Sequence, residues 1–153
     1  MTHNARDLVT SYYAAFNAGD YTSLLELLTD DVVHDINQGE RETGKDAFRQ
    51  FLARMDACYA EQIRDLVVLT EPAGRRAAAE FIVHGTYKKA DAGLPPAHGQ
   101  SYVLPVGAFF EIRDGKIARV TNTYNLNDWL RQVRGAGGSA GRSLTAAQPG
   151  GGR

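Results

Sequence analysis

The sequence predicts an α+β domain in which N-terminal helices pack on a curved, mostly antiparallel sheet. Two observations lead to this prediction. Apolar residues recur at helical spacing in much of residues 5–59, whereas four later segments read as strands separated by turns and one loop. Helices that precede a run of antiparallel strands are typical of α+β folds, because the helices cover one apolar face of the sheet.

Two helices are predicted near the N-terminus. Residues 5–18 ("ARDLVTSYYAAFNA") have one apolar face, which is formed by Leu8, Tyr12, Ala15 and Phe16. Gly19 is a typical helix-ending residue, and Asp20 is a typical cap for a second helix in "YTSLLELL".

A short strand and a third helix follow. Residues 32–37 are rich in β-branched residues and predict the strand. The segment "TGKD" (43–46) has the form of a capping box and predicts the start of the helix. The apolar positions of this helix are Phe48, Phe51, Leu52, Met55 and Tyr59. Cys58 follows the same stripe and is predicted to be a small core residue.

The second half of the chain contains four predicted strands and a closing helix. The strands are residues 64–70, 75–89, 100–112 and 116–125. Asp114-Gly115 predicts a tight hairpin, whereas residues 90–99 form a longer loop. "LNDWLRQV" predicts the closing helix. The domain is therefore predicted to span residues 1–134, and the Gly/Ala-rich residues 135–153 are predicted to be a disordered tail.

The composition excludes several classes of partner. The 153 residues (16.7 kDa) are 43% hydrophobic and 23% charged, with a net charge of −1, as in an ordinary globular domain. No basic patch favours nucleic acid, and no apolar run reaches the roughly 20 residues that cross a membrane. One cysteine and an N-terminus without signal-peptide features predict a cytoplasmic protein. The outer sheet face needs cover, which predicts a homodimer.

The stretch "DDVVHDINQG" (30–39) is the most unusual part of the sequence. His34, Asp35 and Asn37 lie in a strand that enters a small core, where polar side chains are costly unless they are paired or functional. Neighbouring strand residues point to opposite faces, so on a regular strand only one of His34 and Asp35 faces a pocket. Histidine suits a base near neutral pH, and burial would raise the pKa of an aspartate base.

Three segments resemble a known superfamily. "YYAAFNAGDY", "LLTDDVV" and "FFEIRDGKIARV" resemble the nuclear-transport-factor-2-like superfamily, and within it ketosteroid isomerase and the SnoaL-like polyketide cyclases. The resemblance spans roughly residues 5–133. It implies a cone-shaped fold with a hydrophobic pocket on the concave side of the sheet. Such proteins include isomerases, cyclases, epoxide hydrolases and non-catalytic domains, so the fold alone does not fix the function.

The resemblance also implies positions for catalytic residues. Ketosteroid isomerase uses an Asp base, and its oxyanion hole consists of a Tyr and a protonated Asp. The Tyr corresponds to Tyr12 in this chain. The base corresponds to Ile36, one residue after Asp35, and the protonated Asp corresponds to Ala108 or Gly107.

Two registers are open for the strand that contains His34. The ungapped register turns His34 into the pocket, whereas a bulge would turn Asp35 inward. In epoxide-hydrolase-like relatives a strand carboxylate stands at the position of Asn122. The predicted catalytic residues are Tyr12, His34 and Asp35, and the predicted substrate-binding residues are Asn37, Phe81, Tyr102, Ala108, Asn122 and Tyr124.

These residues predict a cofactor-free acid–base enzyme that acts on a small apolar carbonyl compound. It is most like a ketosteroid-isomerase-type isomerase, with cyclase or hydrolase also open. His34 or Asp35 would move a proton while Tyr12, helped by Asn122 or Tyr124, stabilises an enolate-like oxygen. The alternative is a non-catalytic small-ligand-binding or dimerisation domain that keeps the pocket. Four scattered histidines without metal-ligand spacing predict no metal.

Overall fold

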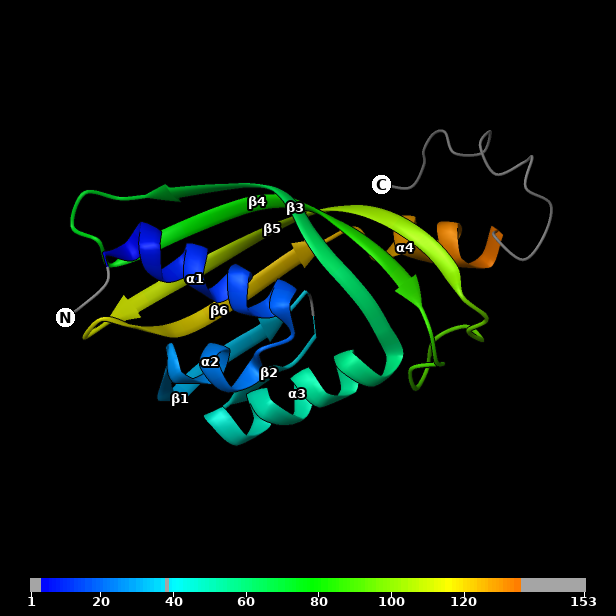
Figure 1. Cartoon of the computed structure of the whole chain (residues 1–153), viewed down its shortest axis with the longest axis horizontal. Helices are drawn as coiled ribbons and strands as arrows, with labels where there is room; N and C mark the ends of the chain where they lie inside the picture. Colours follow the sequence, from blue (N-terminus) through cyan, green and yellow to red (C-terminus); the bar gives the residue numbers. More distant parts are fainter. Residues whose placement is uncertain (1–3, 38, 136–153) are drawn as a thin grey trace.

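The computed structural model describes residues 4–37 and 39–135 (Figure 1). Within these residues the elements, in chain order, are α1 (Ala5–Ala18), α2 (Tyr21–Glu26), β1 (Leu28–Ile36), β2 (Arg41–Thr43), α3 (Lys45–Cys58), β3 (Tyr59–Thr70), β4 (Arg76–Tyr87), β5 (Gln100–Arg113), β6 (Lys116–Tyr124) and α4 (Leu126–Gly135). Most of the tail predicted for 135–153 lies outside the described residues. None of the helices within the described ranges is long and apolar enough to cross a bilayer.

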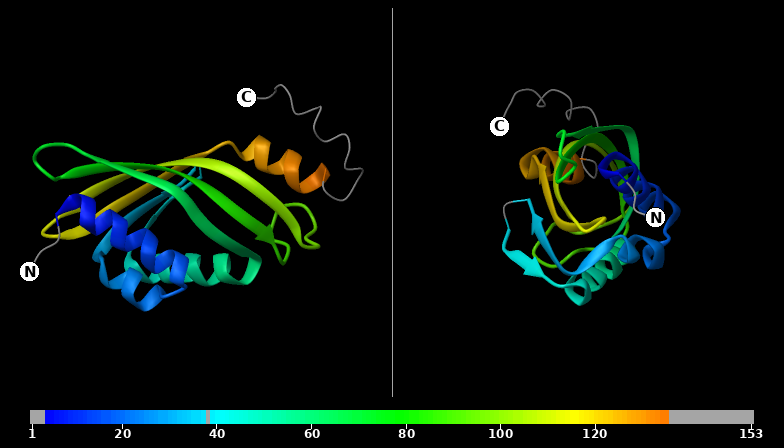
Figure 2. Two further views of the ribbon diagram at one scale, coloured as in Figure 1. Left: turned by 45° about the horizontal axis from the view of Figure 1, so that its top comes forward. Right: turned by 90° about the vertical axis from the view of Figure 1, so that its left-hand side faces the viewer.

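The strands form one sheet in the order β2-β1-β6-β5-β4-β3. β1 and β6 pair in parallel, and the other neighbours pair antiparallel. The sheet is strongly curved and wraps around a central space, and α1 and α3 lie along its open side (Figure 2). The predicted α+β class, with N-terminal helices on a curved and mostly antiparallel sheet, is confirmed.

The caps of the first two helices agree with the sequence, whereas the third does not. Gly19 adopts a left-handed φ of 71° at the end of α1. The Asp20 side chain accepts a hydrogen bond from the Ser23 backbone N–H (3.1 Å) and caps α2. The capping box predicted at residues 43–46 is wrong, because the N-cap of α3 is Gly44, which has a φ of 102° and no side-chain cap.

Two strands begin earlier than predicted because their partners extend them. β1 begins at Leu28 rather than at residue 32, since Leu28 already pairs with Ile117 of β6. β3 begins at Tyr59 rather than at residue 64, since Tyr59 pairs with Tyr87 at the far end of β4. The helical stripe that was predicted to include Tyr59 therefore ends at Cys58, a buried free thiol.

α4 covers the part of β5 that β6 does not reach, because β6 pairs with β5 only from Val106 onward. The Gln132 side chain takes the place of a strand partner there. Its amide N–H donates to the carbonyl of Val103 (2.8 Å), and its carbonyl oxygen accepts from the Val103 N–H (2.9 Å). Trp129 is buried on the inner side of α4 and contacts the ring of Tyr102 edge-on. α4 thus covers the edge of β5 that has no partner in β6.

The convex face of the sheet exposes apolar side chains at its centre. Cross-strand partners share a face, so Leu69, Ala78, Phe109 and Thr121 form one row across four strands. Val103 and Phe109 are each 49% exposed. This face is opposite to the one covered by α1 and α3, and an apolar patch of this kind is typical of an interaction surface.

Candidate functional site

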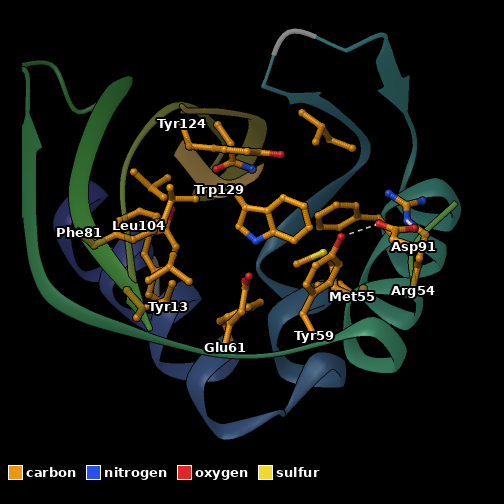
Figure 3. Close-up of a pocket in the computed structure, with 18 of the residues that line it drawn as sticks. Tyr13, Arg54, Met55, Tyr59, Glu61, Phe81, Asp91, Leu104, Tyr124 and Trp129 are labelled. Atoms are coloured by element: carbon orange, nitrogen blue, oxygen red, sulfur yellow. Dashed lines mark hydrogen bonds and ion pairs between the residues drawn. The ribbon is translucent and has the colours of Figure 1, made fainter. Parts of the chain in front are cut away.

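A cavity of about 190 Å³ lies between the concave face of the sheet and the helices (Figure 3). Most of its wall is apolar. Its polar lining side chains are Tyr12, Tyr13, Arg54, Tyr59, Glu61, Asp91, Asn122 and Tyr124. A mainly apolar wall with a few convergent polar groups is typical of a site for a small molecule.

Glu61 of β3 is the acidic side chain that points into the middle of this cavity (Figure 3). Removal from water raises the pKa of its carboxyl above the ordinary value of 4.5. A hydrogen bond from the Tyr102 hydroxyl to Glu61 Oε2 opposes part of that rise. A carboxyl group with a raised pKa in an apolar cavity is suited to accept a proton and to return it.

Gly85 makes the contact between Tyr102 and Glu61 possible. Glu61, Gly85 and Tyr102 form one row across β3, β4 and β5. The Tyr102 ring occupies the space above Gly85, because a Cβ at that position would lie 2.3 Å from Cζ of the ring. The missing side chain on the middle strand lets the ring cross β4 and reach the carboxyl on β3.

Glu61 also borders a second hollow of about 230 Å³, which lies beside the ends of α1 and α3. Its wall is more polar and includes Asn17, Gln62 and Lys88. Glu61 is therefore part of the wall between an apolar cavity and a polar hollow. Such a position gives a carboxyl group both a dry side for a ligand and a wet side for proton exchange.

The loop over residues 88–99 closes one end of the cavity through Asp91 and Leu94. The Tyr59 hydroxyl donates to Asp91 Oδ2 (2.8 Å), and Arg54 Nε lies 3.6 Å from Asp91 Oδ1 (Figure 3). Burial and the hydrogen bond to Asp91 raise the pKa of the Tyr59 phenol. These contacts tether the loop to α3 and to the start of β3.

His34 lies behind the cavity wall, and only 1% of its surface is exposed. Its ring stacks on Phe48 (4.4 Å between centroids) and meets Phe51 edge-on (4.6 Å). Desolvation lowers the pKa of His34 to about 4, so the ring is neutral at neutral pH. His34 points inward, which is the orientation that the ungapped register implies, and Ile36, on the same face, lines the cavity. The pairing of β1 with β6 is irregular earlier in the strand, between Leu28 and Val33. His34 does not itself line the cavity.

The structure does not bring Asp35 or Asn37 to the cavity, which corrects two predictions. Asp35 points to the opposite face, where Arg41 binds both of its carboxylate oxygens (2.8 and 3.0 Å) and Thr121 donates to Oδ2 (2.8 Å). The hydrogen bonds from Arg41 lower the pKa of Asp35. Asn37 adopts a φ of 51° just after β1, and its Oδ1 accepts from the Tyr124 backbone N–H (3.1 Å). Both side chains hold the strand ends in place.

The other predicted residues surround the cavity in different ways. Tyr12, Phe81, Asn122 and Tyr124 line it. Tyr102 does not line the cavity itself but donates a hydrogen bond to Glu61, which does. Ala108 does not line the cavity: it is buried in the core beneath the wall, where its small side chain adds no polar group. Burial raises the pKa of the Tyr12 phenol, so this hydroxyl keeps its proton and is available as a donor.

Sequence reasoning missed Glu61. Residues 59–63 ("YAEQI") alternate as a strand does, and Tyr59, Glu61 and Ile63 share the inner face. A single glutamate between two apolar residues of that face was the available signal. The helical spacing assigned to Tyr59 obscured it, because residues 60–63 then lie between the predicted helix and the predicted strand at 64–70.

No group of three His, Cys, Asp or Glu side chains within residues 4–37 and 39–135 is placed to hold a metal ion. The polar groups of the cavity are a carboxyl, phenols, an amide and one ion pair. Their chemistry is proton transfer and hydrogen bonding to a ligand oxygen.

Comparison with known proteins identifies close relatives. The SnoaL-like domain family matches residues 9–120. A proposed polyketide cyclase from Pseudomonas putida is 60% identical, with a TM-score of 0.85, and the match covers 86% of this chain and 98% of that one. A second, from Xanthomonas campestris pv. campestris, is 56% identical, with a TM-score of 0.82, over 84% of this chain and 96% of that one. No curated protein matches.

More distant structures share the fold alone. An epoxide hydrolase from Mycobacterium tuberculosis, of the limonene-epoxide-hydrolase-like type, is 18% identical with a TM-score of 0.66. That match covers 95% of this chain and 90% of the other. A nuclear-transport-factor-2-like protein from Burkholderia xenovorans is 14% identical with a TM-score of 0.70, over 87% of this chain and 98% of that one. The resemblance seen in the sequence is confirmed at the level of the superfamily.

Proposed function

The chain belongs to the SnoaL-like domain family, and from that premise we propose that it is a cofactor-free acid–base enzyme acting on a small, mainly apolar carbonyl compound. Glu61 is the group that transfers the proton. The observation that supports this role is a carboxyl in an apolar cavity whose pKa is raised by burial and whose orientation is held by Tyr102. His34 and Asp35 do not have these properties.

The proposed reaction begins with removal of a proton from the carbon next to a carbonyl group. The Glu61 carboxylate takes the proton, and the electron pair of the C–H bond moves to the carbonyl oxygen to form an enolate. The phenols of Tyr12 and Tyr124, which line the same cavity, donate hydrogen bonds to that oxygen. The hydrogen bond from Tyr102 favours the ionised form of Glu61 and so counteracts the desolvation of the base.

Two outcomes are open to the enolate. Return of the proton from Glu61 to a different carbon gives an isomer, as in a ketosteroid-isomerase-type reaction. Attack of the enolate carbon on a second carbonyl of the same molecule forms a carbon–carbon bond, and the new alkoxide takes the proton from Glu61. The names of the two similar bacterial proteins favour the second outcome, a cyclisation.

The protein is proposed to act as a homodimer in the cytoplasm. The exposed apolar row on the convex sheet face, which includes Phe109, is suited to a second copy of the chain. Cys58 is buried and unpaired, which fits a reducing compartment.

A non-catalytic ligand-binding domain is the alternative. The resemblance to ketosteroid isomerase places Ile36 at the position of the base and Ala108 or Gly107 at that of the protonated Asp, and the lack of a carboxyl at these positions favours loss of the usual reaction. A cavity without proton transfer would still bind an apolar ligand.

Deuterium exchange separates the two functions. The probe is 2-tetralone, an apolar bicyclic ketone with acidic protons beside its carbonyl, in D₂O with NMR detection. We expect the wild-type protein to accelerate deuterium uptake, and we expect Glu61→Gln to reduce that acceleration by ~100-fold or more, as loss of a general base does. Binding of the ketone by both proteins without any acceleration would establish the binding domain instead.

A further inference from the structure

Three neighbouring strands bring Glu42, His34 and Asn122 together on the inner face of the sheet. His34 of β1 pairs with Glu42 of β2 on one side and with Val120 of β6 on the other. Cross-strand partners share a face, so Glu42 and His34 point to the same side of the sheet. Asn122 follows two residues after Val120 on that face and lines the cavity.

One ring nitrogen of His34 is already hydrogen-bonded. Nε2 lies 3.3 Å from the amide nitrogen of Asn122. An amide N–H donates to a ring nitrogen only if that nitrogen carries no proton. His34 is neutral, so its proton is then on Nδ1.

Two buried polar atoms of these paired residues remain without hydrogen-bond partners in the described part of the chain. His34 Nδ1 and Glu42 Oε1 are both buried and have no hydrogen-bond partner among the described residues. Because His34 and Glu42 are cross-strand partners on one face of the sheet, the unpaired ring nitrogen and the unpaired carboxyl oxygen belong to neighbouring side chains. A donor and an acceptor left in this way are costly unless they are joined, and one buried water is the usual link.

We propose that Glu42 and His34 form a relay that positions Asn122 for ligand recognition. His34 Nδ1–H donates toward Glu42 Oε1 through one buried water, and His34 Nε2 accepts from the Asn122 amide. The amide is thereby fixed with Oδ1 turned away from His34. No described residue donates to this oxygen.

The relay predicts a chemical group of the substrate. This prediction about the substrate rests on the proposed function. Asn122 offers the cavity an acceptor, so the ligand carries a hydroxyl or enol O–H at that point. The substrate class is therefore a carbonyl compound with a hydroxyl group. A site built to bind a hydroxyl discriminates strongly against an analogue that lacks the donor.

The tautomer of His34 tests the relay directly. Long-range ¹H–¹⁵N NMR of the full chain at pH 7 reports which ring nitrogen carries the proton, and contacts to the rings of Phe48 and Phe51 identify the His34 signals. We expect the proton on Nδ1. We expect Glu42→Gln, which keeps an acceptor, to retain this form and Glu42→Leu to shift the proton to Nε2. Glu40→Leu, at an exposed residue of the same segment, is the control.

A wild-type ring protonated on Nε2, or no effect of Glu42→Leu, would overturn the relay. Neither result depends on catalysis, so the relay and the role of Glu61 fail separately. The ligand preference has its own probe pair, 2-naphthol and 2-methoxynaphthalene, which differ in the O–H donor. We expect ~10-fold tighter binding of 2-naphthol and loss of that preference in Asn122→Leu but not in Tyr124→Phe. Equal affinities in the wild type would contradict the hydroxyl assignment.

Discussion

The Tyr102 hydroxyl donates a hydrogen bond to Glu61 across the strand that separates them. The two residues lie in one row of the sheet, and the residue between them is Gly85, above which the Tyr102 ring passes. A carboxyl that is costly to bury is thus given one charge-stabilising partner and otherwise faces an apolar cavity on one side and a more polar hollow on the other. We therefore propose Glu61 as a general base rather than as a member of a structural ion pair.

The pH dependence of deuterium exchange is expected to follow the Glu61 carboxyl. The base is active when ionised, so the rate rises with pH through its pKa, which lies above 4.5. Tyr102→Phe removes a hydrogen bond that lowers this pKa, so the midpoint of the profile should move to higher pH. Tyr13→Phe is the matched control. A midpoint that is the same in Tyr102→Phe and wild type would show that Glu61 is not the titrating base.

Gly85→Ala is expected to reproduce the effect of Tyr102→Phe and also to destabilise the fold. The new Cβ would lie 2.3 Å from the Tyr102 ring, which must move away from Glu61. Overpacking of this kind costs about 1–3 kcal/mol, measurable by urea unfolding. Gly107→Ala is the control, because its Cβ would meet only Thr123 Oγ1, at 3.3 Å. A pH profile of Gly85→Ala equal to that of the wild type would contradict the proposal that the missing side chain at Gly85 lets Tyr102 reach Glu61.

Tyr13→Phe is expected to leave stability unchanged or to increase it. The Tyr13 hydroxyl is buried and has no hydrogen-bond partner among the described residues, while its ring packs on Phe81 (4.7 Å between centroids). Removing an unsatisfied buried hydroxyl while keeping the ring loses no favourable contact. Thermal unfolding of both proteins measures the difference. A destabilisation above about 1 kcal/mol would indicate a partner for this hydroxyl.

Acid sensitivity is expected to depend on His34. Its pKa is about 4 in the folded protein against 6.5 for an ordinary histidine, so the unfolded chain binds more protons between these values. Stability therefore falls as pH falls from 6.5 to about 4, by up to about 3 kcal/mol from this residue. Urea unfolding across this range should show the slope in wild type and a reduced slope in His34→Phe. Equal slopes would mean that His34 is not desolvated in solution.

The convex sheet face is expected to hold a homodimer together. Phe109→Glu adds a charge at the centre of the exposed apolar row, and burying that charge in an interface is costly. Sedimentation should show a dimer for wild type and a monomer for Phe109→Glu. Lys116→Glu, an exposed charge change at the start of β6, is the control. A wild-type protein that sediments as a monomer would contradict the predicted partner.

Much of the fold was open to prediction because its signals are local. The helical face of residues 5–18, the Gly19 stop and the Asp114-Gly115 turn each depend on a few neighbouring residues. The early starts of β1 and β3 were not predictable in this way. They depend on pairing with Ile117 and Tyr87, which are distant in sequence.

The candidate site was only partly open to prediction for the same reason. Asn122 and Tyr124 were found because the strand period and the family resemblance place them on the concave face, and Tyr12 because the resemblance assigns it on the apolar face of the first helix. The inward turn of His34 agreed with the ungapped register, but its burial against Phe48 depends on α3. Glu61 was missed because its role depends on a gap at Gly85 and a hydroxyl from Tyr102, two strands away.

Titration of the Glu61 carboxyl by ¹³C NMR tests the central claim most directly. The signal is identified by its absence in Glu61→Gln. We predict a pKa clearly above 4.5 in the wild type and a further rise in Tyr102→Phe. A Glu61 carboxyl that titrates at or below 4.5 would not have the pKa raised by burial on which the proposed acid–base chemistry depends, and that proposal would be wrong.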